Sequence, residues 1–361
     1  MRDVGVRIVH QGRTTPTRVT FEAEQTRDPT MCYSAEVWAS FDRYRAIGGV
    51  LAIKEFVKLA GWTQKKGVWI RTLPQALRRA LLGTQREYGD EVFKAFAAAE
   101  ISGIDDLTED LQKQEDRLAR AKEILASHKP TKAAEKERAA AEKKIKAGLR
   151  KLDDLKREPP ADGTGRIWPG HFCPVLIRDP ESGERLIVPM RYRCRLPGWT
   201  EQDERLKPGT YNARRDKLST VWRRLFGYTH GIVGATHFFE SVSLHRLQQR
   251  DLTPGEKDVS VEIEFAPEPA QDLYLACLWR YIEDTPEQPG FYTFAIITRD
   301  PPQEVQAAGH DRCVIAIRKE NVQAWLNPDP HHLQAMYDIL DNPVDAYYTH
   351  ELLRKDDDEA Q

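Results

Sequence analysis

Cys32 has the most distinctive chemical potential in this sequence, because it directly follows a methionine, Met31. If translation starts at Met31 and that residue is removed, Cys32 becomes the first residue of the chain. An N-terminal cysteine carries an amine and a thiol two carbons apart, so both can add to one aldehyde and close a thiazolidine ring. Both groups are largely protonated at neutral pH, and a nearby proton acceptor would assist them. The alternative interpretation is a buried structural cysteine.

Three further residues could supply the acid, base and polar contacts that such chemistry needs. Glu240 follows two phenylalanines at the end of a predicted strand, and a carboxyl group among aromatic rings has a raised pKa suited to general acid–base catalysis. His310 can shuttle a proton near neutral pH. The Asn212 amide can both donate and accept hydrogen bonds. Taken singly, each residue also has a purely structural interpretation. Glu240 could be an exposed strand-end glutamate, His310 a core or capping histidine, and Asn212 a turn asparagine.

Read in chain order, these residues lie in four motifs that resemble the SRAP (SOS-response-associated peptidase, or abasic-site processing) family. The resemblance covers residues 31–34 and 167–317 and rests on these sequences: Met31-Cys32, Tyr211-Asn212-Ala213-Arg214, Thr236-His237-Phe238-Phe239-Glu240 and His310-Asp311-Arg312. The chain departs from the family pattern at Tyr33-Ser34 (usually Gly-Arg), Thr236-His237 (usually Asp-Gly), Ser241 (usually Trp) and Cys313-Val314 (usually Met-Pro-Val).

The resemblance implies an enzyme that recognises abasic sites in single-stranded DNA. Cys32 would form a thiazolidine crosslink to the opened sugar, and Glu240 would assist the reaction or its reversal. Asn212 would hold the amine or the sugar, and His310 would polarise the sugar oxygen. Arg214 and Arg312 would contact phosphates, and Trp199, after Pro197-Gly198, would stack on a base or else pack in the core.

A second set of basic residues lies upstream of these motifs. Arg191, Arg193 and Arg195 alternate along a predicted strand and therefore share one face. We include Arg193 among the predicted DNA-binding residues. The net charge of −2 gives no general support for nucleic-acid binding, and a solvated charged face is the alternative.

Residues 1–31 precede the predicted first residue of the mature chain. We interpret them as a mis-assigned start, since Met31 would place Cys32 in the family's position. The alternative is a leader that the protein removes itself, with Cys32 attacking the preceding carbonyl group assisted by Glu240 or His310. A leader that stayed attached would block the amine and prevent thiazolidine formation.

The composition restricts the remaining functional classes. Five cysteines without a CxxC pair argue against a disulfide framework or a zinc ribbon, and we assign no metal and no cofactor. Apolar stretches are too short for a membrane helix, and the first 30 residues lack the apolar core of a secretory signal. We therefore expect a cytoplasmic protein. The resemblance implies that its partner is single-stranded DNA containing abasic sites, and we expect it to act as a monomer.

The pattern along the chain predicts an α+β fold, which the resemblance specifies as a curved, barrel-like, mainly antiparallel sheet flanked by helices. We expect residues 34–100 to be largely helical, with Gly61 ending one helix, and a helix over residues 215–226. Predicted strands cover 174–178, 186–193, 231–236, 259–265, 274–279, 291–298 and 313–317. Accordingly, 32–100 and 164–345 would form the catalytic domain, followed by an acidic tail over 346–361.

Residues 101–163 have a different pattern and predict an inserted helical hairpin. Apolar residues recur at heptad spacing on both sides of Pro130, and Gln114 is the polar seam position of the first helix. We interpret the hairpin as a solvent-exposed insertion without chemistry rather than a partner-binding arm.

Two other functions remain open at this point. One is a cysteine peptidase that acts on other proteins, although no triad-like order supports it. The other is a non-catalytic DNA- or protein-interaction module built around the hairpin, with a decayed site.

Overall fold

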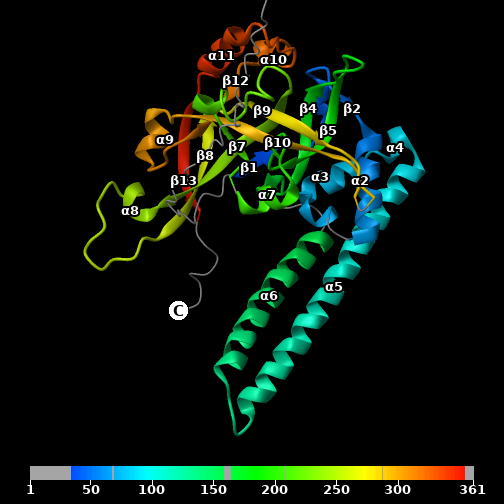
Figure 1. The fold of residues 1–361 in the computed structure, drawn as a ribbon, viewed down its shortest axis with the longest axis vertical. Coiled ribbons are helices and arrows are strands. Elements are labelled where there is room, and N and C mark those ends of the chain that lie inside the picture. The colour runs from blue at the N-terminus through cyan, green and yellow to red at the C-terminus, as the bar shows by residue number, and fades with distance from the viewer. Residues whose placement is uncertain (1–33, 67–68, 158–163, 208, 287, 354–361) are drawn as a thin grey trace, which may run out of the picture.

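The computed structural model describes residues 34–66, 69–157, 164–207, 209–286 and 288–353, which form an α+β fold around one curved sheet (Figure 1). Thirteen strands make up this sheet: β1 (Ser34–Val37), β2 (Val50–Leu51), β3 (Arg166–Ile167), β4 (Phe172–Arg178), β5 (Arg185–Tyr192), β6 (Asn212–Arg214), β7 (His230–Ser243), β8 (Ser260–Glu268), β9 (Leu273–Ile282), β10 (Phe291–Arg299), β11 (Cys313–Val314), β12 (Ala316–Ile317) and β13 (Tyr347–Leu353).

Five of the strands close into a barrel. They pair in the order β9, β10, β5, β4 and β7, and β7 pairs again with β9 to complete the ring. Strands β8 and β13 continue the sheet outward from β7. Most pairs are antiparallel, whereas β10 runs parallel to β5 and β6, and β2 runs parallel to β5. The predicted barrel-like, mainly antiparallel sheet is confirmed.

Alternation along the strands divides the apolar side chains between two cores. Val175 on β4 joins the core on one side of the sheet, with Val233, Phe294 and other inward-facing residues. Its neighbour Leu176 faces the other way and packs beneath the helices. The barrel is therefore a rigid, filled support for the polar residues at the ends of its strands.

Helices flank the sheet and cover its outer core. They are α1 (Phe41–Arg45), α2 (Ile53–Lys66), α3 (Gln75–Leu82), α4 (Gln85–Tyr88), α5 (Asp90–Ala126), α6 (Lys132–Lys156), α7 (Glu201–Leu206), α8 (Leu244–Leu247), α9 (Gln303–Ala307), α10 (Val322–Trp325) and α11 (Leu333–Asp341), with short 3₁₀ helices η1 (Ile70–Thr72), η2 (Arg215–Lys217) and η3 (Lys319–Asn321).

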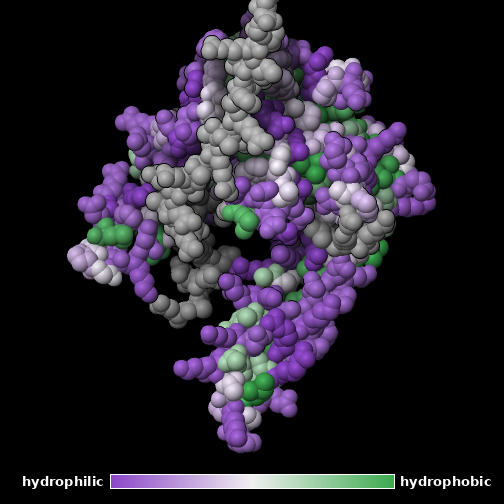
Figure 2. Space-filling view, viewed as in Figure 1, coloured by the Kyte–Doolittle hydropathy of each residue, from purple (hydrophilic) through white to green (hydrophobic). Residues whose placement is uncertain are grey.

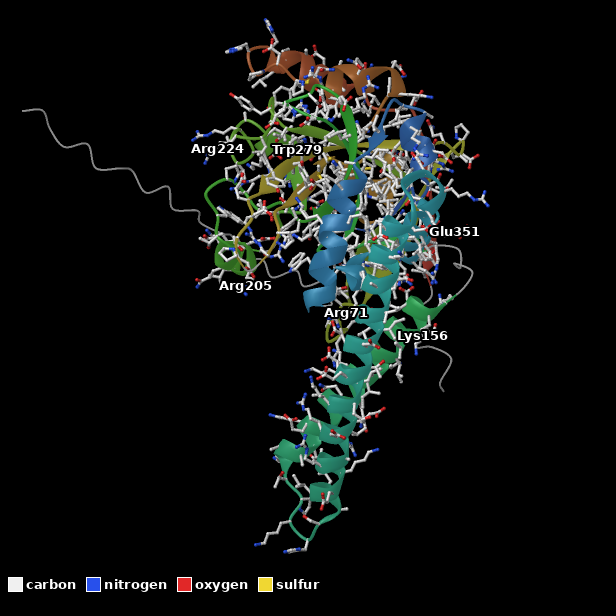
Figure 3. All side chains as sticks on the ribbon, turned by 90° about the vertical axis from the view of Figure 1, so that its right-hand side faces the viewer. Arg71, Lys156, Arg205, Arg224, Trp279 and Glu351 are labelled. Carbon is white, nitrogen blue, oxygen red and sulfur yellow. The ribbon has the colours of Figure 1, made fainter. Side chains whose placement is uncertain are left out.

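Helices α5 and α6 form the predicted hairpin, which projects from the barrel (Figures 1 and 3). The expected seam is confirmed, because Leu107, Leu111, Ala121 and Ala141 are buried along it. The first helix is longer than predicted and begins at Asp90, since its first turns pack against the helices beside the barrel. Figure 2 shows mostly hydrophilic side chains on the outside of the hairpin.

Several local predictions are wrong. Ser34–Val37 form strand β1, and α2 continues through Gly61, where an interior glycine costs only about 1 kcal/mol. Residues 215–226 form η2 and successive turns instead of one helix, although their apolar side chains are buried as the spacing predicted. The Thr220 hydroxyl donates to the Lys217 carbonyl oxygen, a local bond that competes with helical hydrogen bonding.

The prediction of an acidic tail over residues 346–361 is also wrong in part. Tyr347–Leu353, which we assigned to an acidic tail, form β13 and pair along β8. Tyr348 is buried against Phe238, so this segment belongs to the packed sheet. Within the described part of the chain, none of the helices has the length and apolarity needed to cross a membrane.

Candidate functional site

Glu240 and His310 form a buried pair at the centre of the candidate site. The Glu240 Oε2 and His310 Nε2 atoms are 3.0 Å apart, and Glu240 and His310 are 1% and 7% exposed. The other ring nitrogen of His310 lies 2.8 Å from the Arg312 carbonyl oxygen. When Nδ1 donates its proton to that oxygen, Nε2 faces the carboxyl group and can exchange a proton with it.

Two strand-connected segments bring this pair together. Glu240 lies on β7 beside Ile263 of β8, inside the sheet. His310 lies between α9 and β11, directly after Gly309. Gly309 has φ of +90°, and a Cβ atom there would lie 2.9 Å from the Arg246 Cβ atom, so this turn requires glycine. The turn thus positions the His310 ring against the Glu240 carboxyl group on β7.

Burial and pairing set the protonation of the two groups. Burial raises the pKa of Glu240 to about 7, although the hydrogen bond and charge of His310 oppose the rise. Burial acts to lower the pKa of His310, but its hydrogen bond and attraction to Glu240 prevail, and that pKa is raised. The pair therefore retains a shared proton around neutral pH, which is the property of a general acid–base group.

One oxygen of Glu240 is available for a further contact. Glu240 Oε1 is buried and has no hydrogen-bond partner among the described residues. A buried carboxyl oxygen without a partner costs free energy, so a donor from a bound molecule would be stabilising there.

A basic pocket contains both arginines that the motifs singled out. Arg214 and Arg312 line a pocket of about 310 Å³, and its other lining residues are Arg215, Asp216, Thr298, Arg299 and Asp300. Strand β10 explains this meeting, because Thr298 pairs with Arg214 of β6 on one side and with Val314 of β11 on the other. Four arginines against two aspartates leave the pocket with an excess of positive charge.

Arg214 and Arg312, the two arginines predicted to contact phosphates, are not neutralised by a buried carboxylate. The Arg214 guanidinium donates to Asp216 at 2.8 Å, and both side chains are well exposed, at 40% and 52%. Arg312 lies 3.8 Å from Asp311, and its Nε atom makes no hydrogen bond within the described structure. Both aspartates are exposed, so these pairs are weak and exchange readily for a phosphate.

Asn212 lies on the same short strand as Arg214, two residues earlier, so both side chains leave one face of β6. The Tyr192 hydroxyl lies 3.5 Å from Asn212 Oδ1, at the outer limit of a hydrogen bond. Burial raises the pKa of Tyr192 well above its usual value, and the nearby Glu240 charge adds to the effect. Tyr192 is thus beside Asn212 and within the electrostatic influence of Glu240, and the motif comparison missed it.

Trp199 is partly buried and packs against the helix-side core, with the Lys207 ammonium 4.8 Å from its ring centre. It does not line the basic pocket. Base stacking by Trp199 stays a prediction.

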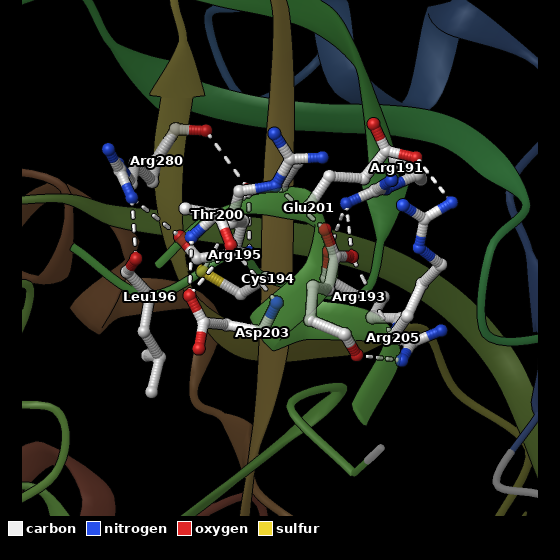
Figure 4. A network of polar contacts seen from close by, with 12 residues as sticks. Arg191, Arg193, Cys194, Arg195, Leu196, Thr200, Glu201, Asp203, Arg205 and Arg280 are labelled. Atoms are coloured by element: carbon white, nitrogen blue, oxygen red, sulfur yellow. Dashed lines mark hydrogen bonds and ion pairs between the residues drawn. The ribbon is translucent and has the colours of Figure 1, made fainter. Parts of the chain in front are cut away.

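Arg193 belongs to a separate cluster (Figure 4). Arg191, Arg193 and Arg195 share one face as predicted, but all three pair with Glu204 of α7. The Glu204 side chain is 4% exposed. Burial alone would raise the pKa of Glu204, yet the attraction and hydrogen bonds of the arginines lower it. The pocket formed by Arg214 and Arg312 does not include Arg193.

Cys32 lies outside the described residues, but the strand that begins two residues later is firmly placed. Ser34 pairs with Phe239, the neighbour of Glu240. The Ser34 hydroxyl accepts hydrogen bonds from the Arg166 guanidinium at 2.9 and 2.7 Å. That guanidinium also lies 3.6 Å from the Phe239 ring centre and pairs with Glu262. Neither Arg166 nor Ser34 was predicted, since their contacts join segments 132 residues apart.

The described residues contain no group of three or more His, Cys, Asp or Glu side chains that could hold a metal ion. The candidate site is therefore described by its acid–base pair, its basic pocket and the start of β1.

Comparison with known proteins identifies a family whose sequence profile matches this chain. The sequence profile of the family described as SOS response associated peptidase (SRAP) matches residues 131–353, a range that includes Asn212, Glu240 and His310 but not Cys32. No curated protein matches.

Similar solved structures include a protein from Bordetella bronchiseptica, with 17% identity, coverage of 53% of this chain and 88% of that chain, and a TM-score of 0.42. A protein from Bacteroides thetaiotaomicron has 17% identity, coverages of 53% and 78%, and a TM-score of 0.41. A phage-related protein from Bordetella bronchiseptica has 19% identity, coverages of 53% and 81%, and a TM-score of 0.39. The family profile covers more than half of the sequence, and the chain belongs to the SOS response associated peptidase (SRAP) family.

Proposed function

We propose that the mature chain begins at Cys32, recognises abasic sites in single-stranded DNA and captures them as a thiazolidine crosslink. Family membership associates the protein with the response to DNA damage and with abasic-site processing in general. The observation that carries the finer proposal is the buried Glu240–His310 pair, 3.0 Å apart, in which Glu240 lies on the strand that also pairs with Ser34.

The state of the other cysteines supports Cys32 as the nucleophile. The chain has five cysteines, and the other four are free and buried. Burial raises the pKa of all four, Cys173, Cys194, Cys277 and Cys313, which disfavours their thiolate forms. None of these four is suited to attack an aldehyde of a DNA strand at the surface.

Chain connectivity also supports Cys32. Two peptide units limit the distance between the Cα atoms of Cys32 and Ser34 to about 7 Å. Ser34 is fixed beside Phe239 by strand pairing and by Arg166. The fixed position of Ser34 next to the strand that carries Glu240 supports a role for Cys32 in the same site.

The proposed reaction is balanced and requires only proton movements. The Cys32 amine adds to the aldehyde carbon of the opened sugar, and loss of one water gives an imine. The thiol sulfur then adds to the imine carbon, its proton passes to the nitrogen, and the ring closes. Glu240 and His310 accept the amine proton and return a proton to the departing water. In reverse, the same pair protonates the ring and admits water, which regenerates the aldehyde and the free aminothiol. We propose that this thiol-dependent, lyase-like enzyme thereby forms and releases the crosslink.

The basic pocket would hold the DNA backbone during this reaction. Arg214 and Arg312 would each contact a phosphate beside the lesion, since both line the pocket and neither is in a buried ion pair. Asn212 would orient the amine or the opened sugar, and Trp199 would stack on a flanking base.

The proposal requires a free amine on Cys32. Residues preceding it must therefore be absent from the start or removed, by an aminopeptidase or by the protein itself. We further propose a catalytic domain of residues 32–100 and 164–353, which includes β13, that acts as a monomer in the cytoplasm.

A denaturing gel tests the proposal. Protein expressed from Met31 is incubated with single-stranded DNA carrying one abasic site. We expect a shifted band that survives denaturation, its loss in Cys32→Ala, and a crosslinking rate reduced roughly 10²–10⁴-fold in Glu240→Gln. His332→Gln is the matched control for His310→Gln, because His332 forms an exposed pair with Asp329.

The rival functions predict different results. A peptidase acting on other proteins would cleave an unrelated peptide without DNA, and an interaction module would bind DNA equally well after Cys32→Ala. A band that persists in Cys32→Ala, or no band with Cys32 exposed at the N-terminus, would contradict the proposal.

A further inference from the structure

The hairpin is divided by charge along its length. Near the barrel, residues 100–111 contain five Asp or Glu and no Lys or Arg. Beyond them, residues 112–151 contain thirteen Lys or Arg and six Asp or Glu, a net charge of +7 in a chain whose total is −2. The acidic part is tied to the body, since Asp110 pairs with Arg71 and Glu100 with Arg79. The basic part projects away from it (Figures 1 and 3).

Four basic side chains on α6 are arranged in a row. Lys136, Lys143 and Arg150 are spaced by seven residues, and Lys132 lies one turn before Lys136. At 100° per residue, these four positions fall within about 40° around the helix, and the row is about 27 Å long. Ala134 and Ala141, which face α5 and are buried, lie on the opposite side. The row therefore faces away from the hairpin seam and into solvent.

The row is exposed and is not neutralised. Lys132, Lys136, Lys143 and Arg150 are all exposed, and none has an ion-pair or hydrogen-bond partner within the described residues. The positions between them on this face include Ala139 and Ala147, which leave the cations unobstructed. Two of the three acidic residues beside the row are engaged elsewhere, since Glu137 pairs with Arg117 and Glu142 with Arg138. The third, Glu135, lies three residues after Lys132 and opposes part of the charge of the row.

Solubility alone does not explain this arrangement, because mixed charges on one helix would serve that purpose. A long row of one sign on a rigid helix suits a rigid polyanion. Duplex DNA presents one negative charge per about 1.7 Å of its axis and stays straight over far more than 27 Å. A single strand would have to be ordered along the row, which costs conformational entropy.

We infer that the α6 face formed by Lys132, Lys136, Lys143 and Arg150 binds the phosphate backbone of duplex DNA. This second contact lies on the projecting arm, whereas the pocket lined by Arg214 and Arg312 lies on the barrel. It holds duplex DNA without reading its sequence, and it does not depend on Cys32 or on the presence of an abasic site. The hairpin is thus a DNA-binding arm and not the inert insertion that the heptad pattern suggested.

The test uses the full 361-residue chain and an unmodified, fluorescent 30-base-pair duplex in a salt series. We expect Lys136→Ala/Lys143→Ala/Arg150→Ala to weaken binding at least tenfold near 0.1 M salt. The slope of log K against log salt should fall by about 2 to 3, since each lost phosphate contact contributes about 0.9. The matched control is Lys54→Ala/Arg86→Ala/Lys319→Ala, which removes the same charge from exposed positions on the body.

Three outcomes would overturn the inference: unchanged binding by the α6 variant, an equal loss in both triple variants, or a loss confined to single-stranded DNA. Crosslinking of a seven-nucleotide abasic strand by protein beginning at Cys32 serves as the companion measurement. The α6 variant should leave its rate unchanged, so failure of the arm and failure of the thiazolidine proposal are distinguishable. Equal thermal midpoints of the variants establish that the fold is intact.

Discussion

Two groups of arginines lie on this protein, and their surroundings differ. Arg191, Arg193 and Arg195, which are labelled in Figure 4, converge on the buried carboxylate of Glu204. Arg214 and Arg312 line an open pocket and pair only with exposed aspartates. In the sequence the arginines of both groups lie in short motifs, and we predicted DNA contacts in each group. The structure shows that one group is neutralised internally, whereas the charge of the other is available to a ligand.

The comparison teaches that the location of the counter-charge distinguishes structural from ligand-binding arginines. Glu204 follows the arginines by 9 to 13 residues and is placed by a short helix that begins with a capping box of Thr200 and Asp203. The cluster therefore holds α7 against the end of β5, directly before the Asn212 strand. The predictions below separate stability from DNA binding in the two groups.

The largest effect is expected at Glu204. Glu204→Ala leaves three partly buried guanidinium groups without a carboxylate, which should lower the free energy of unfolding by about 3–5 kcal/mol. Denaturant unfolding measures this change. Arg214→Ala is the matched comparison, and its effect should be below about 0.5 kcal/mol because the side chain is exposed. Similar losses in the two variants would break the comparison.

For DNA affinity, we expect the Arg214 and Arg312 variants to show the larger effect. Arg214→Ala and Arg312→Ala should each weaken binding of single-stranded DNA about tenfold and reduce the salt slope by about 0.7, the value for one phosphate contact to a single strand. Arg193→Ala should leave the slope unchanged while destabilising the fold. Fluorescence anisotropy across a salt series measures both. A reduced slope for Arg193→Ala would restore the sequence-based role of that residue.

The smallest effect is a difference in pH dependence between Glu204 and Glu240. The pKa of Glu204 is lowered in the folded protein, so its stabilising contribution is present above the unfolded value near 4.3 and is lost as pH falls. The pKa of Glu240 is raised to about 7, so stability is greatest below the unfolded value and declines as pH rises through 7.

Thermal midpoints from pH 3 to 9 measure both carboxyl groups. Glu204→Gln should flatten the acidic side of the profile, and Glu240→Gln should flatten the neutral side. The raised pKa of His310 acts in the same direction as that of Glu240 and depends on it. An unchanged neutral side in Glu240→Gln would contradict the shared proton of the pair.

The sequence contained enough information for the long strands and the hairpin, because alternation and heptad spacing are local signals. It was less informative for β1, β6 and β13, which are held by pairing with distant strands and have little pattern of their own. The turns at 215–226 bury the predicted apolar residues without a continuous helix, because helical spacing fixes which side chains are buried better than how the backbone closes.

The residues of the candidate site also fall into those that the sequence predicted and those that only the structure revealed. Residue type and motif singled out Glu240 and His310, and the structure brings them to 3.0 Å. Tyr192 and Arg166 escaped notice, since their importance comes from contacts across the barrel. The partner of Arg193 could have been found, because the Thr200–Asp203 capping pattern predicts the helix that carries Glu204.

Peptide mass spectrometry of the crosslinked protein tests the central claim most directly. Protein expressed from Met31 is reacted with abasic single-stranded DNA, and the DNA and protein are then digested. We predict an N-terminal peptide that begins at Cys32 and carries the sugar remnant, with a mass one water below the sum of its parts and no free thiol. A remnant on a lysine, or a crosslinked peptide that still begins with Met31, would contradict the account.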